Sequence, residues 1–158
     1  MERLTRRCLL LISLFCLTSA AYASDYLLPL EGRQQFTVFI SARGMELTGV
    51  CIIKTDEEGS KGAIVNEFGV HALDFTLSSD RRKVKLLNVM PVMDHWYIKK
   101  VVRGDLKYLF LATENPQSKG KRTVTVEDDG TVTLENMKYR LKYSLKPINN
   151  TQDDETAE

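Results

Sequence analysis

The chain has 158 residues, and its 22 Lys and Arg nearly balance its 21 Asp and Glu, so that the formal net charge is +1. This balance excludes a general nucleic-acid binder, which needs a strongly basic surface to neutralise phosphates. Hydrophobic residues make up 43% of the chain, enough to form the core of one domain.

The first 23 residues have the order of a secretory signal. Three Arg stand in a short basic start, an apolar run covers residues 8–17, and small residues follow up to Ala23. The apolar run is about half as long as the roughly 20 residues of a membrane-spanning helix, which favours a cleaved signal over a permanent anchor. We therefore predict an exported protein that begins at Ser24, with the periplasm as its location. The alternative is an outer-membrane lipoprotein acylated at Cys16.

One cysteine remains after the predicted cleavage, since Cys8 and Cys16 precede it and Cys51 follows it. The remaining chain therefore cannot form an intrachain disulfide, and its core must provide the stability. Cys51 stands between Val50 and Ile52 in an apolar stretch, which predicts a buried, unreactive thiol rather than a nucleophile.

Apolar and polar residues alternate through most of the chain, which is typical of strands with one buried face. The first half predicts five such strands, and Gly69 joins the third and the fourth in a tight turn. These strands cover residues 36–40, 47–54, 62–68, 70–77 and 83–89.

The period changes after Pro91, where apolar side chains recur at helical spacing from Trp96 to Phe110. Asp94 is the predicted N-cap of this helix. Gly104 interrupts the pattern and indicates a kink, a break or a close packing contact. We expect Trp96 to point toward the sheet, because it belongs to the apolar stripe of the helix.

Three further strands are predicted after the helix, around residues 124–126, 132–134 and 139–145. The first two flank Asp128-Asp129-Gly130, and Asp-Gly between alternating runs is a strong hairpin signal. Residues 149–158 are polar and acidic, which predicts a disordered tail. The predicted organisation is a signal peptide at 1–23, a single domain at 24–148 and the tail. The domain belongs to the mainly β (α+β) class, with about eight antiparallel strands and one long helix.

Few residues indicate catalysis or metal binding. The two histidines, His71 and His95, lie in no metal-ligand spacing. His71 and Asp74 are three residues apart, so on a strand their side chains point to opposite faces, which disfavours a relay. The chain contains no Gly-x-Ser-x-Gly motif and no glycine-rich phosphate loop. We expect no catalytic residue, no metal and no cofactor, and an enzyme that uses Glu67 or Asp74 is a third alternative.

Two polar residues, Asn66 and Glu67, interrupt apolar strands, and a buried carboxylate needs partners or a raised pKa. Glu67 is therefore either a ligand contact at the mouth of a cavity or a turn-capping group. Aromatic side chains suited to an apolar ligand also occur along the chain, although each of them could instead fill the core. The candidate cavity residues are Phe36, Phe68, Phe75, Trp96, Phe110 and Glu67.

Most of residues 36–145 resembles a known family. The resemblance rests on Asn66-Glu67-Phe68-Gly69, on Asp74-Phe75, and on the pattern from Leu134-Glu135-Asn136 to Tyr143. The family is that of the LolA/LolB-like periplasmic lipoprotein carriers and the small exported proteins related to them. The resemblance implies a curved antiparallel sheet or incomplete barrel, with the helix against its concave face and an apolar cavity for acyl chains.

Together these features predict a non-enzymatic exported protein that binds a lipid, an acyl chain or a lipidated protein in an apolar groove. The alternative is a structural or interaction protein of the cell envelope, with a fully packed core and no ligand. A peripheral membrane contact is also expected, whereas nucleic acid is not. Basic residues four apart share one side of the helix, where they either meet anionic headgroups or are solvated. They are Lys99, Arg103 and Lys107.

Overall fold

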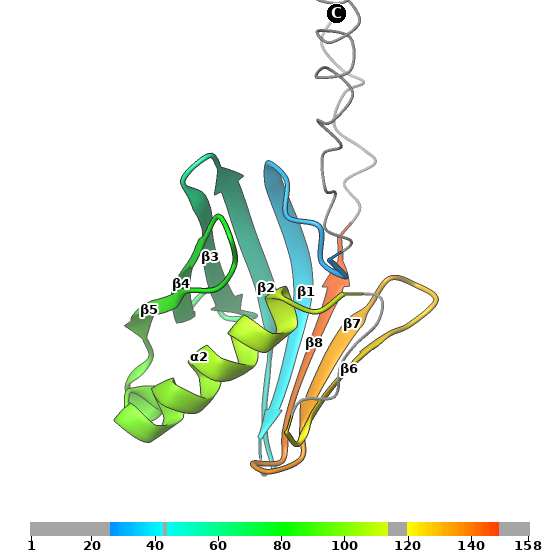
Figure 1. Cartoon of the computed structure of the whole chain (residues 1–158). Coiled ribbons are helices and arrows are strands. Elements are labelled where there is room, and N and C mark those ends of the chain that lie inside the picture. The colour runs from blue at the N-terminus through cyan, green and yellow to red at the C-terminus, as the bar shows by residue number, and fades with distance from the viewer. Residues whose placement is uncertain (1–25, 43, 114–119, 149–158) are drawn as a thin grey trace, which may run out of the picture.

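The computed structural model describes residues 26–42, 44–113 and 120–148, so the predicted signal peptide and tail lie outside the described residues. In these residues eight antiparallel strands form one open sheet, and Figure 1 shows the α-helix crossing a face of that sheet at an angle to the strands. This arrangement confirms the predicted α+β class, with mostly strand and a single helix in the described part of the chain. The sheet is uncurled, so an incomplete barrel is not the form that it adopts.

The two groups of strands predicted on either side of the helix join in the middle of the sheet. The sheet order is β5-β4-β3-β2-β1-β8-β7-β6, and pairing between β1 and β8 connects the groups. The strands are β1 Arg33–Ala42, β2 Met45–Asp56, β3 Gly59–Asn66, β4 His71–Ser78, β5 Val84–Val89, β6 Arg122–Val126, β7 Val132–Asn136 and β8 Leu141–Pro147.

Alternation along the strands places one set of apolar side chains beneath the helix. Phe36 and Val38 on β1, and Ile53 on β2, are at most 3% exposed. Gly62 on β3 leaves room for a neighbouring ring, because a Cβ atom at this position would lie 2.2 Å from Cζ of Phe75. The core therefore lies between the helix and this face of the sheet.

The helix α2, Trp96–Phe110, follows a short 3₁₀ turn, η1, at Pro91–Met93. The prediction of Asp94 as N-cap is wrong: the N-cap is His95, which makes no side-chain capping bond, while Asp94 pairs with Lys99. The helix continues through Gly104 without a break. Of the three interpretations of this glycine, close packing holds, since a Cβ atom there would lie 3.2 Å from Nη2 of Arg122.

The C-terminal end of α2 is held by the chain that precedes β1. Arg81, in the turn after β4, packs over the ring of Tyr26 with its Cζ atom 4.0 Å from the ring centroid. Its Nη1 donates hydrogen bonds to the carbonyl oxygens of Leu28, at 2.7 Å, and of Phe110, at 3.2 Å. One guanidinium thus joins the segment before β1, the β4–β5 turn and the end of the helix.

Candidate functional site

A groove of about 710 Å³ separates the N-terminal half of α2 from the sheet. Its helix wall comes from η1 and the first turns of α2 and includes Met93, Ile98 and Val101. Its sheet wall includes Ile64 of β3 and Leu141 of β8. The lining is mainly apolar, and the volume falls within the roughly 300–1,000 Å³ that small-molecule sites occupy.

The groove exists because the two halves of α2 approach the sheet differently. Leu106, Leu109 and Phe110 in the C-terminal half are at most 3% exposed and do not line the groove. In the N-terminal half the helix residues line the groove instead, and the sheet wall opposite them includes two small side chains, Ala42 and Ala72. The open part of the interior therefore lies under the first turns of the helix.

The charged groups that line the groove are all cationic. Lys100 of α2 and Arg122 of β6 belong to the lining, and no Asp or Glu does so within the part of the chain that the structure describes. Lys100 is exposed and forms no ion pair with a described residue. Three tyrosines provide the remaining polar groups that can ionise, and they are Tyr97, Tyr139 and Tyr143.

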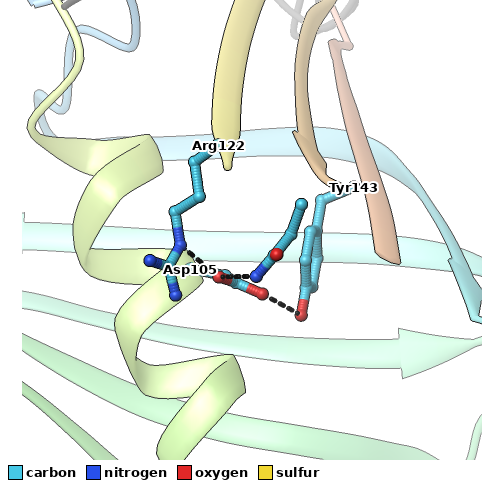
Figure 2. Close-up of polar contacts among 4 residues, drawn as sticks. Asp105, Arg122 and Tyr143 are labelled. Carbon is cyan, nitrogen blue, oxygen red and sulfur yellow. Dashed lines mark hydrogen bonds and ion pairs between the residues drawn. The ribbon is translucent and has the colours of Figure 1, made fainter. Parts of the chain in front are cut away.

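A buried carboxylate lies behind two of the residues that line the groove, Arg122 and Tyr143. The side chain of Asp105 on α2 has no exposed surface, and Figure 2 shows it pointing toward Arg122 and Tyr143. Its Oδ1 accepts hydrogen bonds from Nε of Arg122 at 2.6 Å and from Nδ2 of Asn136 at 2.8 Å. Its Oδ2 accepts one from the Tyr143 hydroxyl at 3.2 Å. These partners compensate the cost of removing the charge from water.

The hydrogen bonds of Asp105 tie one helix to three strands. Arg122 begins β6, Asn136 ends β7 and Tyr143 lies within β8, so the cluster fixes the helix over this side of the sheet. Burial, together with the nearby charge of Asp105, raises the pKa of Tyr143 well above its usual value of 10. The Tyr143 hydroxyl therefore keeps its proton and remains a donor at neutral pH.

The candidate aromatic residues do not gather at the groove. Phe36, Phe75 and Phe110 are buried in the core, where the rings of Phe75 and Phe110 lie 5.5 Å apart. Phe68 is 80% exposed, in the β3–β4 turn. Trp96 alone of the six candidates lines the groove, and it is 75% exposed because it starts the helix where the helix stands off the sheet. Trp96 thus forms the mouth of the groove rather than part of the core.

Glu67 lies in the β3–β4 turn and does not line the groove. Its Oε2 accepts a hydrogen bond from the Thr48 hydroxyl at 3.0 Å, and it is exposed. The side chain that organises the turn is Asn66, whose Oδ1 accepts hydrogen bonds from the backbone N–H groups of Phe68 and Val70. The polar pair seen in the sequence therefore serves this turn, with Asn66 in the capping role.

The three basic residues singled out on the helix also lie outside the lining. Lys99 pairs with Asp94, and Arg103 and Lys107 are exposed. The cation that does line the groove on this helix is Lys100, one position after Lys99. Sequence reasoning missed it because a rotation of about 100° per residue separates neighbours, and the orientation of the helix was not known.

The Asp105 cluster was missed as well, although the sequence carries a signal for it. Asp105 stands among Val102, Leu106 and Leu109, residues that occupy the buried side of α2. A carboxylate on the apolar side of a helix needs hydrogen-bond donors from another element. The pattern predicts that partners exist, but the donors come from strands that follow the helix in the chain and could not be identified.

The prediction that His71 and Asp74 point to opposite faces is wrong. Nδ1 of His71 lies 3.2 Å from Oδ1 of Asp74, and Nδ2 of Asn88 donates to Oδ2 of Asp74 at 2.7 Å. The physical reason is a bulge in β4, where Ala72 and Leu73 are both buried and the strict alternation is interrupted. The three polar side chains are not part of the groove lining.

Other reactive groups are few among the described residues. Cys51 is 1% exposed, and burial raises the pKa of its thiol to about 12, which confirms the predicted unreactive thiol. No three His, Cys, Asp or Glu side chains in the described ranges are placed to hold a metal ion. Likewise, no helix in these ranges is long and apolar enough to span a bilayer.

A scan against protein-family models found no match, and a search of curated proteins found no similar sequence. Two features of the molecule bear on its function. One is the apolar groove beneath the first turns of α2, and the other is the set of cationic groups at its edge.

Proposed function

We propose that this protein is a non-enzymatic binding or carrier protein that holds an acyl chain in the groove beneath α2. The observation that carries the proposal is the open, mainly apolar space of about 710 Å³ between the helix and the sheet. Burial of an acyl chain in such a space contributes about 0.8 kcal/mol per methylene group. The resemblance of the sequence to LolA/LolB-like lipoprotein carriers supports the same class of ligand.

A structural or interaction protein without a ligand is the second candidate. It is supported by the C-terminal half of α2, where Leu106, Leu109 and Phe110 pack without leaving space. It is not supported by the N-terminal half, since a purely structural helix gains stability by filling the space beneath it. We therefore place acyl-chain binding first.

Ligand binding can be measured through Trp96, the single tryptophan of the chain, which lines the mouth of the groove. Titration of the purified protein with lauric acid is expected to shift the emission of Trp96, and native mass spectrometry is expected to show a one-to-one complex. The groove-filling variant Ala42→Phe is expected to lose both signals. Its matched control is Ala63→Phe on β3, a residue outside the groove lining, and this variant is expected to bind as the parent protein does.

Two results would contradict the proposal. One is the absence of any co-purified or added lipid in native mass spectra, combined with an unchanged Trp96 emission. The other is equal loss of binding in Ala42→Phe and Ala63→Phe, which would indicate a general effect on folding. The first result would leave the ligand-free interaction protein as the better candidate, and the second would remove the groove as the place where the ligand binds.

The proposal includes export, with the periplasm as the site of action. It is supported by the basic, apolar and small-residue order of residues 1–23. The intact mass of the protein recovered from cells is expected to correspond to a chain that starts at Ser24. A mass that starts at Cys16 and includes acyl groups would instead support the lipoprotein alternative.

The proposal also includes a peripheral contact with a lipid surface. Within the described part of the chain, most of the exposed large hydrophobic side chains lie at the end of the sheet that holds the β1–β2, β3–β4 and β7–β8 turns and the start of α2. Exposed apolar side chains gathered in one region are typical of protein or membrane contacts. They are Met45, Phe68, Val70, Val92, Trp96, Tyr97 and Met137.

A further inference from the structure

The polar edge of the groove has one sign of charge. Lys100 and Arg122 line it, and no carboxylate among the described residues does. A ligand that is apolar along its length and charged at its end would meet only cations here. A selectivity for the charge of the ligand rests on the proposed function, because it concerns the end group of the acyl chain that the groove would hold.

The two cations lie close together along one side of the helix. Gly104 follows Lys100 by four residues, and residues four apart share a face of an α-helix. A Cβ atom at Gly104 would lie 3.2 Å from Nη2 of Arg122, so this guanidinium rests against the helix at that position. The helix position of Lys100 is therefore about one turn, roughly 5–6 Å along the axis, from the position that the Arg122 guanidinium contacts.

Each cation has hydrogen-bonding capacity left for a ligand. The Nε of Arg122 is occupied by Asp105, while its terminal nitrogens form no hydrogen bond with another described residue. Lys100 forms no ion pair with a described residue, unlike its neighbour Lys99, which is held by Asp94. Asp105 neutralises Arg122, so Lys100 supplies the net positive charge of this edge.

We propose that the groove selects a single-chain anionic amphiphile, whose carboxylate or phosphate lies between Lys100 and Arg122 while its acyl chain occupies the apolar groove. Charge-assisted hydrogen bonds from an ammonium and a guanidinium are the strong contacts for such anionic groups. The half-buried position of Arg122 strengthens the contact, because screening by solvent is weaker there than on the surface.

The proposal is tested by comparing ligands that share one alkyl chain and differ in the end group. Affinities of the purified protein for lauric acid, dodecyl phosphate, 1-dodecanol and dodecylamine are measured by calorimetry and Trp96 emission at neutral pH. At least one of the two anions is expected to bind about tenfold more tightly than the alcohol, and the amine is expected to bind most weakly. Tighter binding of lauric acid would show that the groove prefers a carboxylate, and tighter binding of dodecyl phosphate would show that it prefers a phosphate.

Two adjacent lysines provide a matched pair of variants. Lys100→Gln is expected to weaken binding of the preferred anion by about tenfold and to leave the affinity for 1-dodecanol unchanged. Lys99→Gln removes the same charge one residue away, from a side chain outside the lining, and is expected to change neither affinity. High salt is expected to reduce the preference for the anion in the parent protein.

The outcomes separate this inference from the proposed function. Equal affinity of the parent protein for the alcohol and both anions would overturn the inference and leave acyl-chain binding intact. If Lys100→Gln and Lys99→Gln weaken the affinity for the anion equally, the inference would also be overturned. The attraction would then come from the overall positive charge of the helix and not from the side chain that lines the groove. No binding of any of the four ligands would overturn the proposed function itself.

Discussion

The C-terminal half of α2 is packed against the core, whereas its N-terminal half covers an open groove. Leu106, Leu109 and Phe110 are at most 3% exposed, but Trp96 is 75% exposed at the other end of the same helix. Asp105 lies between the two regions and is hydrogen-bonded to three strands. The packed half can therefore hold the helix in place while the other half leaves space for a ligand.

If the proposed function is correct, this difference assigns stability and ligand binding to different residues of one helix. A helix fixed at one end by close packing and a buried carboxylate does not need to fill the space beneath its other end. Substitutions in the packed half should mainly lower the free energy of unfolding, and substitutions in the open half should mainly change ligand affinity.

The largest loss of stability is expected for Phe110→Ala. This change removes a fully buried ring that packs on Phe75 and should lower the free energy of unfolding by about 3–5 kcal/mol. The matched change Tyr97→Ala, at an exposed position in the open half, should alter it by about 0.5 kcal/mol or less. Urea denaturation measures both values, and similar losses in the two variants would contradict the comparison.

A smaller loss of stability is expected for changes at Asp105, at the boundary between the two halves of α2. Asp105→Asn removes the charge and one acceptor oxygen, which leaves a buried donor unsatisfied and should cost about 2–3 kcal/mol. Tyr143→Phe removes one of the hydrogen bonds and should cost about 1 kcal/mol. Because both changes break the same contact, the double variant should lose less than the sum of the two. Strict additivity in a double-mutant cycle would show that the contact is not energetically coupled.

Alkaline pH is expected to lower the stability of the packed core through Cys51. Burial raises the pKa of Cys51 from 9.0 to about 12, so the folded protein keeps a proton that the unfolded chain releases above pH 9. The resulting stabilisation is complete below pH 9, and it decreases by about 1.4 kcal/mol per pH unit as the pH rises toward 12. Cys51→Ala lacks this contribution, so its free energy of unfolding should fall less steeply over that range. Parallel pH profiles of the two proteins would contradict the prediction.

The smallest effects on stability are expected for the exposed hydrophobic residues. Phe68→Ser and Met137→Ser, in turns at the groove end of the sheet, should change the free energy of unfolding by about 0.5 kcal/mol or less. They should nevertheless reduce flotation of the protein with anionic phospholipid vesicles. Leu87→Ser on β5 and Val126→Ser on β6 are the controls, since these exposed residues lie outside that group of turns. Equal reductions in all four variants would contradict a contact localised at the groove end.

Much of the fold could be predicted because its signals are local. Alternation between neighbouring residues is a direct consequence of strand geometry, and it located all eight strands and the turn at Asp128-Asp129-Gly130. The change to helical spacing likewise located α2 between Trp96 and Phe110. The bulge in β4 was not predicted, since consecutive buried residues such as Ala72 and Leu73 give no sign of which one departs from the alternation.

The site was predicted less well, because a site is made by residues that are distant in the chain. Aromatic content singled out Phe36, Phe75 and Phe110, but hydrophobicity does not distinguish a residue that fills a core from one that lines a groove. Lys99 and Lys100 are equivalent by composition, and the orientation of the helix decides which of them meets the groove.

Local patterning is sufficient to predict the strands, the helix and the class of fold, because backbone geometry imposes a period that neighbouring residues reveal. The places where the helix packs closely or leaves a groove, and the partners that surround Asp105, become known only when the elements are assembled. These properties depend on the angle and distance between α2 and the sheet. That geometry is set by the sum of many contacts across the chain, and no short segment contains it.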